Sequence, residues 1–295
     1  MESVPVAFVD HLAELLGKMT LDKCANRFAN VLWERTLELH KTNRWTIDLY
    51  ITKSSDGWNV LFCSYFPNKL YMDGDYTWEE ARTFDRRFTR LTTCVLYKPL
   101  RRTDDDFLVS TDELPKIAEC FRLNSAPSQH IVVDEQKKLK EYEIVLDLLA
   151  GVRFSAPFIG VLNQYSHNFF LQQATSITRL TLKEVDRPED YELLVKLIAM
   201  ENLEECRIRN FDRKLNFIAV EACVEKWKAN EQFRFRLISS GAYSKQEIEP
   251  LFGEADEDGY YALIVEGHTS RFAGLRLGPP LRGKRYTVCG AWPFE

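Results

Sequence analysis

Between residues 152 and 240 the chain repeats one unit, a short apolar strand followed by a helix, and this repeat restricts the fold more than any other feature. The predicted strands begin at separations of 25, 26 and 29 residues, near Val152, Ile177, Leu203 and Gln232. Helical patterns fill the intervals, over 164–174, 188–200 and 217–230. A single strand and helix cannot bury their apolar faces alone, so neighbouring units must stack and share one core. The repeat therefore predicts an α/β fold with a mostly parallel sheet.

Two of the strands share a finer pattern. It runs Ile177-x-x-Leu180-x-Leu182 in one strand, and Leu203-x-x-Cys206-x-Ile208 followed by Asn210 in the next. This spacing resembles the strands of leucine-rich repeats. An ordinary series of right-handed βαβ crossovers produces the same order of elements. A repeat solenoid and an ordinary parallel sheet both remain open at this point.

The regions on either side of the repeat are richer in strands. Over 45–130 we expect a β-rich segment, which begins with a hairpin of residues 45–51 and 58–62 around the turn Asp56-Gly57, because apolar and polar residues alternate on both sides of it. A strand at 131–133 and a helix over 135–150 open the repeats, which extend over 131–240. Short strands over 241–295, at 260–265 and 285–289, should pair antiparallel and close the sheet.

Composition and charge restrict the class of protein. A formal charge of −5 disfavours general nucleic-acid binding, which needs a clustered excess of Lys and Arg. Residues 271–295 are locally basic, and we interpret them as a solvated edge. Seven widely spaced cysteines, an odd number, are typical of a reducing compartment. The start of the chain is not basic and no long apolar run follows it, so we expect no membrane span and an intracellular protein of the cytoplasm or nucleus.

Residues 1–44 form a separate helical pattern. Pro5 suits the first turn of a helix that carries an apolar stripe, and Thr20 is placed to cap a second helix. A third helix is predicted over 31–42, with Leu32 and Trp33 among its apolar anchors. Helices this short cannot build a self-sufficient core, so they should also pack on something else. That surface is either the following sheet, which the segment would then cap, or a partner protein.

This segment resembles an F-box in its Val4-Pro5 opening, in Leu15-Leu16, in Leu21-Asp22 and in Val31-Leu32-Trp33. Residues 169–173, 177–182, 203–210 and 217–227 are similar to the F-box-associated proteins of nematodes, in which one α/β module follows the F-box. The resemblance implies an F-box over 1–44, an F-box-associated module over 45–295, and recruitment of a client protein to a Skp–cullin ubiquitin ligase. It implies that a Skp-type adaptor contacts Pro5, Phe8, Leu12, Leu15, Leu16, Leu32 and Trp33.

No motif in the sequence predicts catalysis. Residues 278–284 match the glycine and lysine spacing of a phosphate-binding loop, but Pro279 and Pro280 remove backbone donors and Arg285 follows where Ser or Thr is required. The acidic and basic residues of 101–106 lack the glycine and the distal glutamate of a calcium loop. Gly-x-Ser-x-Gly, His-Glu-x-x-His and Cys-x-x-Cys motifs are absent. We therefore assign no catalytic, cofactor-binding or metal-binding residue and expect a non-enzymatic, protein-binding chain.

Two alternatives remain. One is an α/β enzyme or small-molecule binder whose site lies at the carboxyl ends of the parallel strands, where a cysteine and a histidine distant in sequence would meet. The other is a degenerate relative of the F-box proteins that keeps the fold and no longer binds the adaptor.

Overall fold

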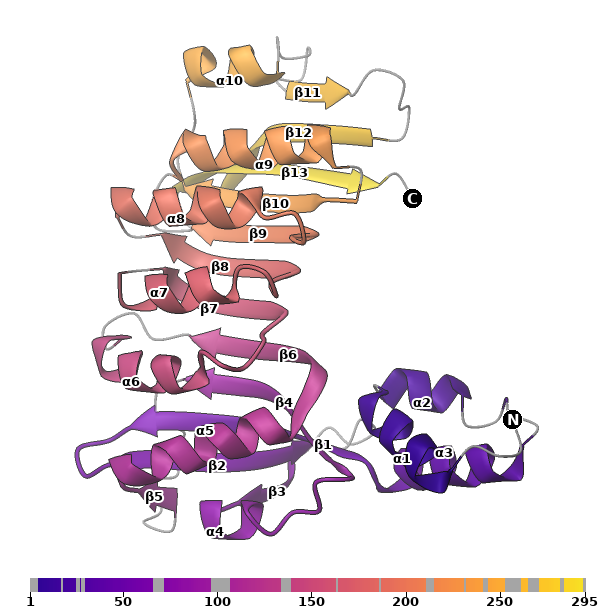
Figure 1. The fold of residues 1–295 in the computed structure, drawn as a ribbon. Coiled ribbons are helices and arrows are strands. Elements are labelled where there is room, and N and C mark those ends of the chain that lie inside the picture. The colour runs from indigo at the N-terminus through magenta and orange to yellow at the C-terminus, as the bar shows by residue number, and fades with distance from the viewer. Residues whose placement is uncertain are drawn as a thin grey trace. The chain divides into compact units, whose positions relative to one another are not determined.

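A computed structural model describes residues 5–16, 18–24, 27, 30–65, 72–96, 107–133, 139–162, 164–185, 187–210, 215–230, 232–240, 244–252, 261–264, 271–281 and 284–293. The chain divides into two compact units. The first consists of Met1–Val132 with Ile144–Phe154, and the second consists of Val133–Glu143 with Ser155–Glu295. Figure 1 shows the elements of both units as a ribbon.

Three short helices open the first unit: α1 (Val6–Leu15), α2 (Lys18–Cys24) and α3 (Val31–Asn43). Their own core is small, and consists of Ala13, Leu21 and Leu37. The predicted cap at Thr20 is wrong, because α2 already begins at Lys18 and Thr20 lies inside it. Threonine is among the weaker capping residues, and the earlier start adds backbone hydrogen bonds within the helix.

The sheet of the first unit has the strand order β6-β4-β1-β2-β3, and β5 pairs with β2. These strands are β1 (Trp45–Lys53), β2 (Trp58–Tyr65), β3 (Met72–Tyr76), β4 (Thr89–Leu96), β5 (Leu108–Val109) and β6 (Ser125–Val133). Antiparallel pairing of β1 with β2 confirms the predicted hairpin. Its turn requires a glycine, because a Cβ on Gly57 would come 2.9 Å from the backbone oxygen of Val109.

Helices α4 (Trp78–Ala81), α5 (Leu114–Leu123) and α6 (Leu139–Leu149) accompany these strands. The predicted helix over 135–150 corresponds to α6, while its expected first residues, 135–138, lie outside the described residues. The predicted strand at 131–133 is longer than expected, since β6 begins at Ser125 and includes Pro127. Proline is uncommon inside strands, which is why the pattern alone placed the start of this strand too late.

The second unit contains the predicted strand–helix repeat. Its elements are β7 (Ala156–Leu162), α7 (Gln164–Gln173), β8 (Arg179–Val185), α8 (Pro188–Ala199), β9 (Glu205–Asn210), α9 (Phe217–Ala229) and β10 (Arg234–Ser240). The four strands are neighbours in sequence order and pair parallel. A ladder of fully or almost fully buried side chains crosses them through Leu182, Ile208 and Leu237. Helices α7, α8 and α9 cover the same face of these strands (Figure 1).

Strands of the repeat begin later than predicted, at residues 156, 179, 205 and 234. Ile177 and Leu203, taken as the first residues of their strands, are buried in the loops just before β8 and β9. These loops are stacked by backbone hydrogen bonds, from the Thr178 N–H to the Ser155 oxygen at 2.8 Å and from the Glu204 N–H to the Thr178 oxygen at 2.8 Å. Apolar character therefore marked the start of each repeat but not the start of its strand.

The end of the chain is antiparallel, as predicted. Helix α10 (Lys245–Phe252) precedes β11 (Tyr261–Ile264), β12 (Arg271–Leu281) and β13 (Lys284–Pro293). Strand β13 pairs antiparallel with both β10 and β12, and β11 pairs antiparallel with β12. Residues 278–281, which matched part of a phosphate-binding loop, belong to β12. Sequence patterns did not predict β12, because its glycines and prolines are typical of turns.

In the part of the chain that the structure describes, the helices of the repeat cover one side of its sheet and leave the other side uncovered (Figure 1). Side chains of β8, β9 and β10 alternate between buried positions under the helices and partly or fully exposed positions on the other face, except at the end of β8, where Val185 is buried. Parallel sheets with helices on both faces have continuous apolar strands instead. The structure is therefore α/β with a mostly parallel sheet, as predicted, and the repeat is one-sided like that of leucine-rich repeats. In the described part of the chain, no helix combines the length and apolar character that crossing a membrane requires.

Candidate functional site

Helix α1 carries apolar side chains on two sides. Val9 and Ala13 are fully buried, whereas Phe8 is 55% exposed and Leu15 is 58% exposed. Leu12 is partly buried and lies between these two in the helical spacing i, i+4, i+7. We call Phe8, Leu12 and Leu15 the outer stripe. A helix that serves only the core of its own unit needs one apolar side, so the outer stripe is the first candidate for a docking surface.

The other residues predicted to contact the adaptor occupy different positions. Pro5 is exposed and precedes α1, next to the outer stripe in sequence. Leu16 packs against the small core of the three helices. Leu32 and Trp33 on α3 are partly buried. The structure therefore places Pro5 directly before α1, Phe8, Leu12 and Leu15 on the outer stripe, and Leu16 in a packing role.

The exposure of the outer stripe can be compared with what we expect if the helical segment is a cap over the sheet. A cap would bury Phe8 and Leu15 against residues 45–100, and both are more than half exposed. Hydrogen bonds instead join α1 to the strands, and Figure 1 shows α1 to α3 beside the first residues of β1. Attachment through the end of α1 thus leaves the outer stripe exposed to solvent.

Two buried arginines hold the carboxyl end of α1. Arg44, which follows α3, donates hydrogen bonds to the backbone oxygens of Leu16 and, at 2.8 Å, of Ala13. Arg90 in β4 donates to the Glu14 oxygen from Nη2 at 3.0 Å and from Nε at 3.3 Å. The last carbonyls of a helix have no partner within it, and a cation there also complements the helix dipole. Burial lowers the pKa of the Arg44 guanidinium to about 10, and the charge of Arg90 acts in the same direction.

A fully buried histidine completes this attachment. His40 Nδ1 lies 3.0 Å from Arg44 Nη2, and His40 Nε2 lies 2.8 Å from Asp10 Oδ1. A guanidinium only donates hydrogen bonds, so Nδ1 accepts and the Nε2–H donates to the carboxylate. Burial acts to raise the pKa of Asp10, but hydrogen bonds from His40 and from Arg87, at 3.1 Å, outweigh it and lower that pKa. Both ring nitrogens of His40 are occupied, so this Asp–His pair is structural and has no nitrogen available for a substrate proton.

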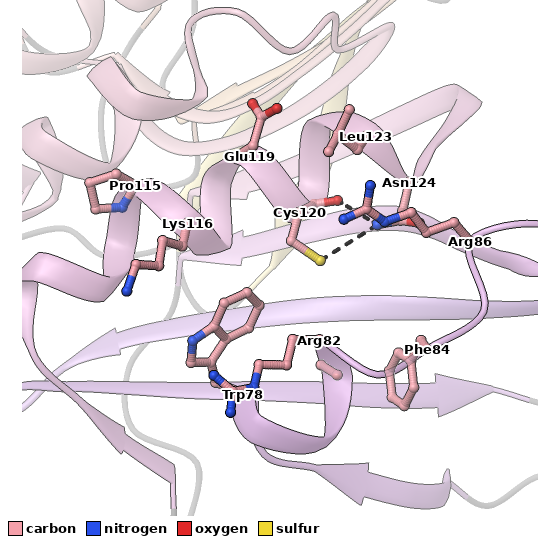
Figure 2. Close-up of a pocket in the computed structure, with 11 residues that line it drawn as sticks. Trp78, Arg82, Phe84, Arg86, Pro115, Lys116, Glu119, Cys120, Leu123 and Asn124 are labelled. Carbon is pink, nitrogen blue, oxygen red and sulfur yellow. Dashed lines mark hydrogen bonds between the residues drawn. The ribbon is translucent and has the colours of Figure 1, made fainter.

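A pocket of about 400 Å³ lies between α4 and α5 (Figure 2). Trp78 forms one wall, and its indole N–H donates to the Glu113 carboxylate at 2.8 Å. Cys120 of α5 points into the pocket and lies 3.5 Å from the side-chain nitrogen of Asn124. Lys116, one of the cations in the lining, is paired with Glu113 at 2.7 Å.

The chemistry of this pocket does not favour a nucleophile. Burial raises the pKa of the Cys120 thiol, although the Asn124 hydrogen bond and the charge of Arg86 act in the opposite direction. A protonated thiol is a poor nucleophile, and the residues that line the pocket include no histidine to take its proton. Within the described ranges, no histidine hydrogen-bonds a cysteine.

A second Asp–His pair lies in the repeat. His167 Nε2 on α7 is 2.7 Å from Oδ1 of the buried Asp190 on α8. The other carboxylate oxygen of Asp190 accepts a hydrogen bond from the Arg187 backbone N–H at 3.1 Å. Asp190 therefore joins α7 to the first turn of α8, which is a structural use of the pair. Several residues directly after the parallel strands, including 211–214 and 241–243, lie outside the described residues, and with them part of the region named by the enzyme alternative.

No metal centre emerges from the part of the chain that the structure describes, where no group of three or more His, Cys, Asp or Glu side chains is close enough to hold an ion. Free thiols are found at Cys24, Cys63, Cys94, Cys120, Cys206 and Cys223. Sequence reasoning found the outer stripe because its spacing is periodic. It missed Arg44, His40 and Arg90, because their contacts join residues far apart in the chain and no short motif marks them.

Comparison with known proteins adds no relative. The chain matches no protein-family model, and no curated protein or solved structure matches it significantly.

Proposed function

We propose that this chain is a non-enzymatic, intracellular receptor of the F-box type. Its helical segment would dock on the Skp-type adaptor of a cullin ubiquitin ligase, and its α/β module would hold a client protein. The observation that carries the proposal is the outer stripe, which is exposed on a helix whose end is fixed to the strands by Arg44 and Arg90. A fixed apolar helix face can enter a partner's groove without first being ordered.

Magnitudes indicate how much of an interface the outer stripe can supply. Full burial of a Leu or Phe side chain stabilises by roughly 1.5–3 kcal/mol, and the two exposed members are already about half buried. Association costs at least about 4 kcal/mol in lost freedom of motion. The outer stripe is therefore suited to be the hot spot of an interface, with Pro5, Leu32 and Trp33 as candidates for the surrounding contacts.

The test is co-expression with a Skp-type adaptor followed by size-exclusion chromatography. The wild-type chain should co-elute with the adaptor, and the double variant Phe8→Ser/Leu15→Ser should not. The matched control is Leu123→Ser/Leu171→Ser, which removes two leucines that are 46% and 45% exposed on α5 and α7. The control should keep the complex.

Two results would count against the proposal. If the wild-type chain elutes separately from the adaptor, the proposed docking is wrong, and the degenerate-relative and enzyme alternatives both stay open. If both double variants lose the complex to the same extent, the outer stripe has no specific role in binding. Circular dichroism of each variant separates loss of docking from loss of folding.

A further inference from the structure

The uncovered face of the repeat is strongly basic. Nine described side chains of β8, β9 and β10 are partly or fully exposed on it, of which six are Arg or Lys and one, Glu205, is acidic, while Val185 at the end of β8 is buried. All six cationic side chains are exposed: Arg179, Lys183, Arg207, Arg209, Arg234 and Arg236. The whole chain carries a formal charge of −5, so this concentration of positive charge is local. We call these six residues the basic face.

Among the described positions of this face, the cationic side chains outnumber the carboxylate of Glu205. Glu205 binds Arg207, with its carboxylate oxygen 2.6 Å from Nε, and it is the register partner of Arg179 on β8 and of Arg234 on β10. Arg207 and Arg236 are direct partners across β9 and β10. Like charges at directly opposite positions destabilise a sheet. Folding alone does not explain such a pair on an exposed face, and a negatively charged ligand would.

We propose that the basic face binds an acidic, extended polypeptide segment. This segment would belong to the client protein, so the inference rests on the receptor function proposed above. Alternate residues of a strand lie about 6.6 Å apart, so Arg207 and Arg209 on β9, like Arg234 and Arg236 on β10, repeat at that distance. Side chains on one side of an extended peptide have the same repeat. Carboxylates at alternate positions of the segment therefore match the arginines along a strand, and each guanidinium can bind a carboxylate through two hydrogen bonds.

A nucleic acid is the other ligand that a basic face could attract. Sheets that bind single strands offer aromatic side chains on which the bases stack. On β7, Phe158 places an aromatic side chain on this face. It is partly buried, and Lys183 Nζ lies 5.2 Å from the centre of its ring. The strands beside it present arginines and no aromatic residue at their exposed positions. Among the described side chains of β7 to β10, the face therefore offers charge without a stacking platform, which favours the acidic peptide.

The test measures fluorescence anisotropy of the full chain with three labelled probes. These are a twelve-residue peptide of alternating Glu and Thr, its Lys-Thr counterpart, and a twelve-nucleotide single-stranded DNA. The variant of the basic face, called the face variant, is Arg209→Gln/Arg236→Gln. The matched control is Lys140→Gln/Lys196→Gln, which removes the same charge from exposed positions on α6 and α8. Adaptor co-elution of the same variants is recorded in parallel.

We expect the Glu-Thr peptide to bind, the Lys-Thr peptide not to bind, and the affinity for Glu-Thr to fall as salt screens the charges. The face variant should bind the Glu-Thr peptide about tenfold more weakly, since two charge-assisted contacts are lost, and the control should change it by less than about twofold. DNA that binds more tightly than the peptide, an equal loss in both variants, or no peptide binding at all would overturn the proposal. If any of these results occurs and the chain still co-elutes with the adaptor, the peptide proposal fails while the proposed receptor function does not.

Discussion

The helical segment and the repeat each leave a surface uncovered, but they do so with opposite chemistry. The helices have a core of three small or medium side chains and expose an apolar stripe. The repeat has long buried ladders and exposes charge. Polar contacts from Arg44 and Arg90 hold α1 in place, whereas burial of apolar side chains holds the repeat together. The comparison shows that an exposed surface is best interpreted together with the interactions that stabilise the region carrying it.

The largest effect should come from the core of the repeat. Leu182 is fully buried and lies between Ile159 and Ile208 in the register of β7, β8 and β9. Leu182→Ala removes buried methyl groups and leaves a cavity, so the free energy of unfolding should fall by about 2–5 kcal/mol. Chemical denaturation followed by circular dichroism measures it.

The matched control for that variant is Thr181→Ala, one residue earlier and on the uncovered face. It should change the free energy of unfolding by less than about 0.5 kcal/mol. Equal losses in the two variants would contradict the one-sided core and, with it, the contrast between the two regions.

Sequence alone predicted the repeat better than the attachment of the helices. Alternating apolar residues such as Leu180 and Leu182 indicate a strand from the local sequence alone. Three of the repeat helices end within one residue of the prediction. The residues of the basic face alternate in the same strands. Only the structure shows that they lie together on a side of the sheet that the described helices do not cover. No sequence pattern marked Arg44 and Arg90, because they bind backbone oxygens of α1. Every residue has such an oxygen, so no residue type identifies the acceptor.

A second effect should separate the two regions directly. Arg44→Met keeps an apolar stem but leaves the Ala13 and Leu16 carbonyls and His40 Nδ1 without their donor. Each hydrogen bond from a charged group contributes about 1.5–3 kcal/mol, and losses within one network are not additive, so opening of the helical segment should become easier by at least roughly 2–3 kcal/mol. Hydrogen exchange should rise in α1 and stay unchanged in β8 to β10.

Arg35→Met on α3 is the control for this variant, because Arg35 is exposed. It should leave the exchange of α1 within about twofold of wild type, as expected for a surface position. If Arg44→Met raises exchange equally in the repeat, the helical segment is not held by an attachment of its own.

The smallest effect concerns acid. The pKa of Asp10 is lowered in the folded chain, so its carboxylate stabilises the segment fully above its unfolded pKa of about 3.9, and this contribution is lost as pH falls through the lower folded value. Below about pH 4 the NMR signals of α1 and α3 should therefore broaden or shift before those of the repeat. Asp10→Asn keeps the size of the side chain and removes the charge, so the variant should start less stable and lose this step of the pH profile. Asp22→Asn, at an exposed position on α2, should keep the step. A wild-type segment that holds its signals to the same pH as the repeat would show that Asp10 adds nothing to the attachment, which would then depend on the two arginines alone.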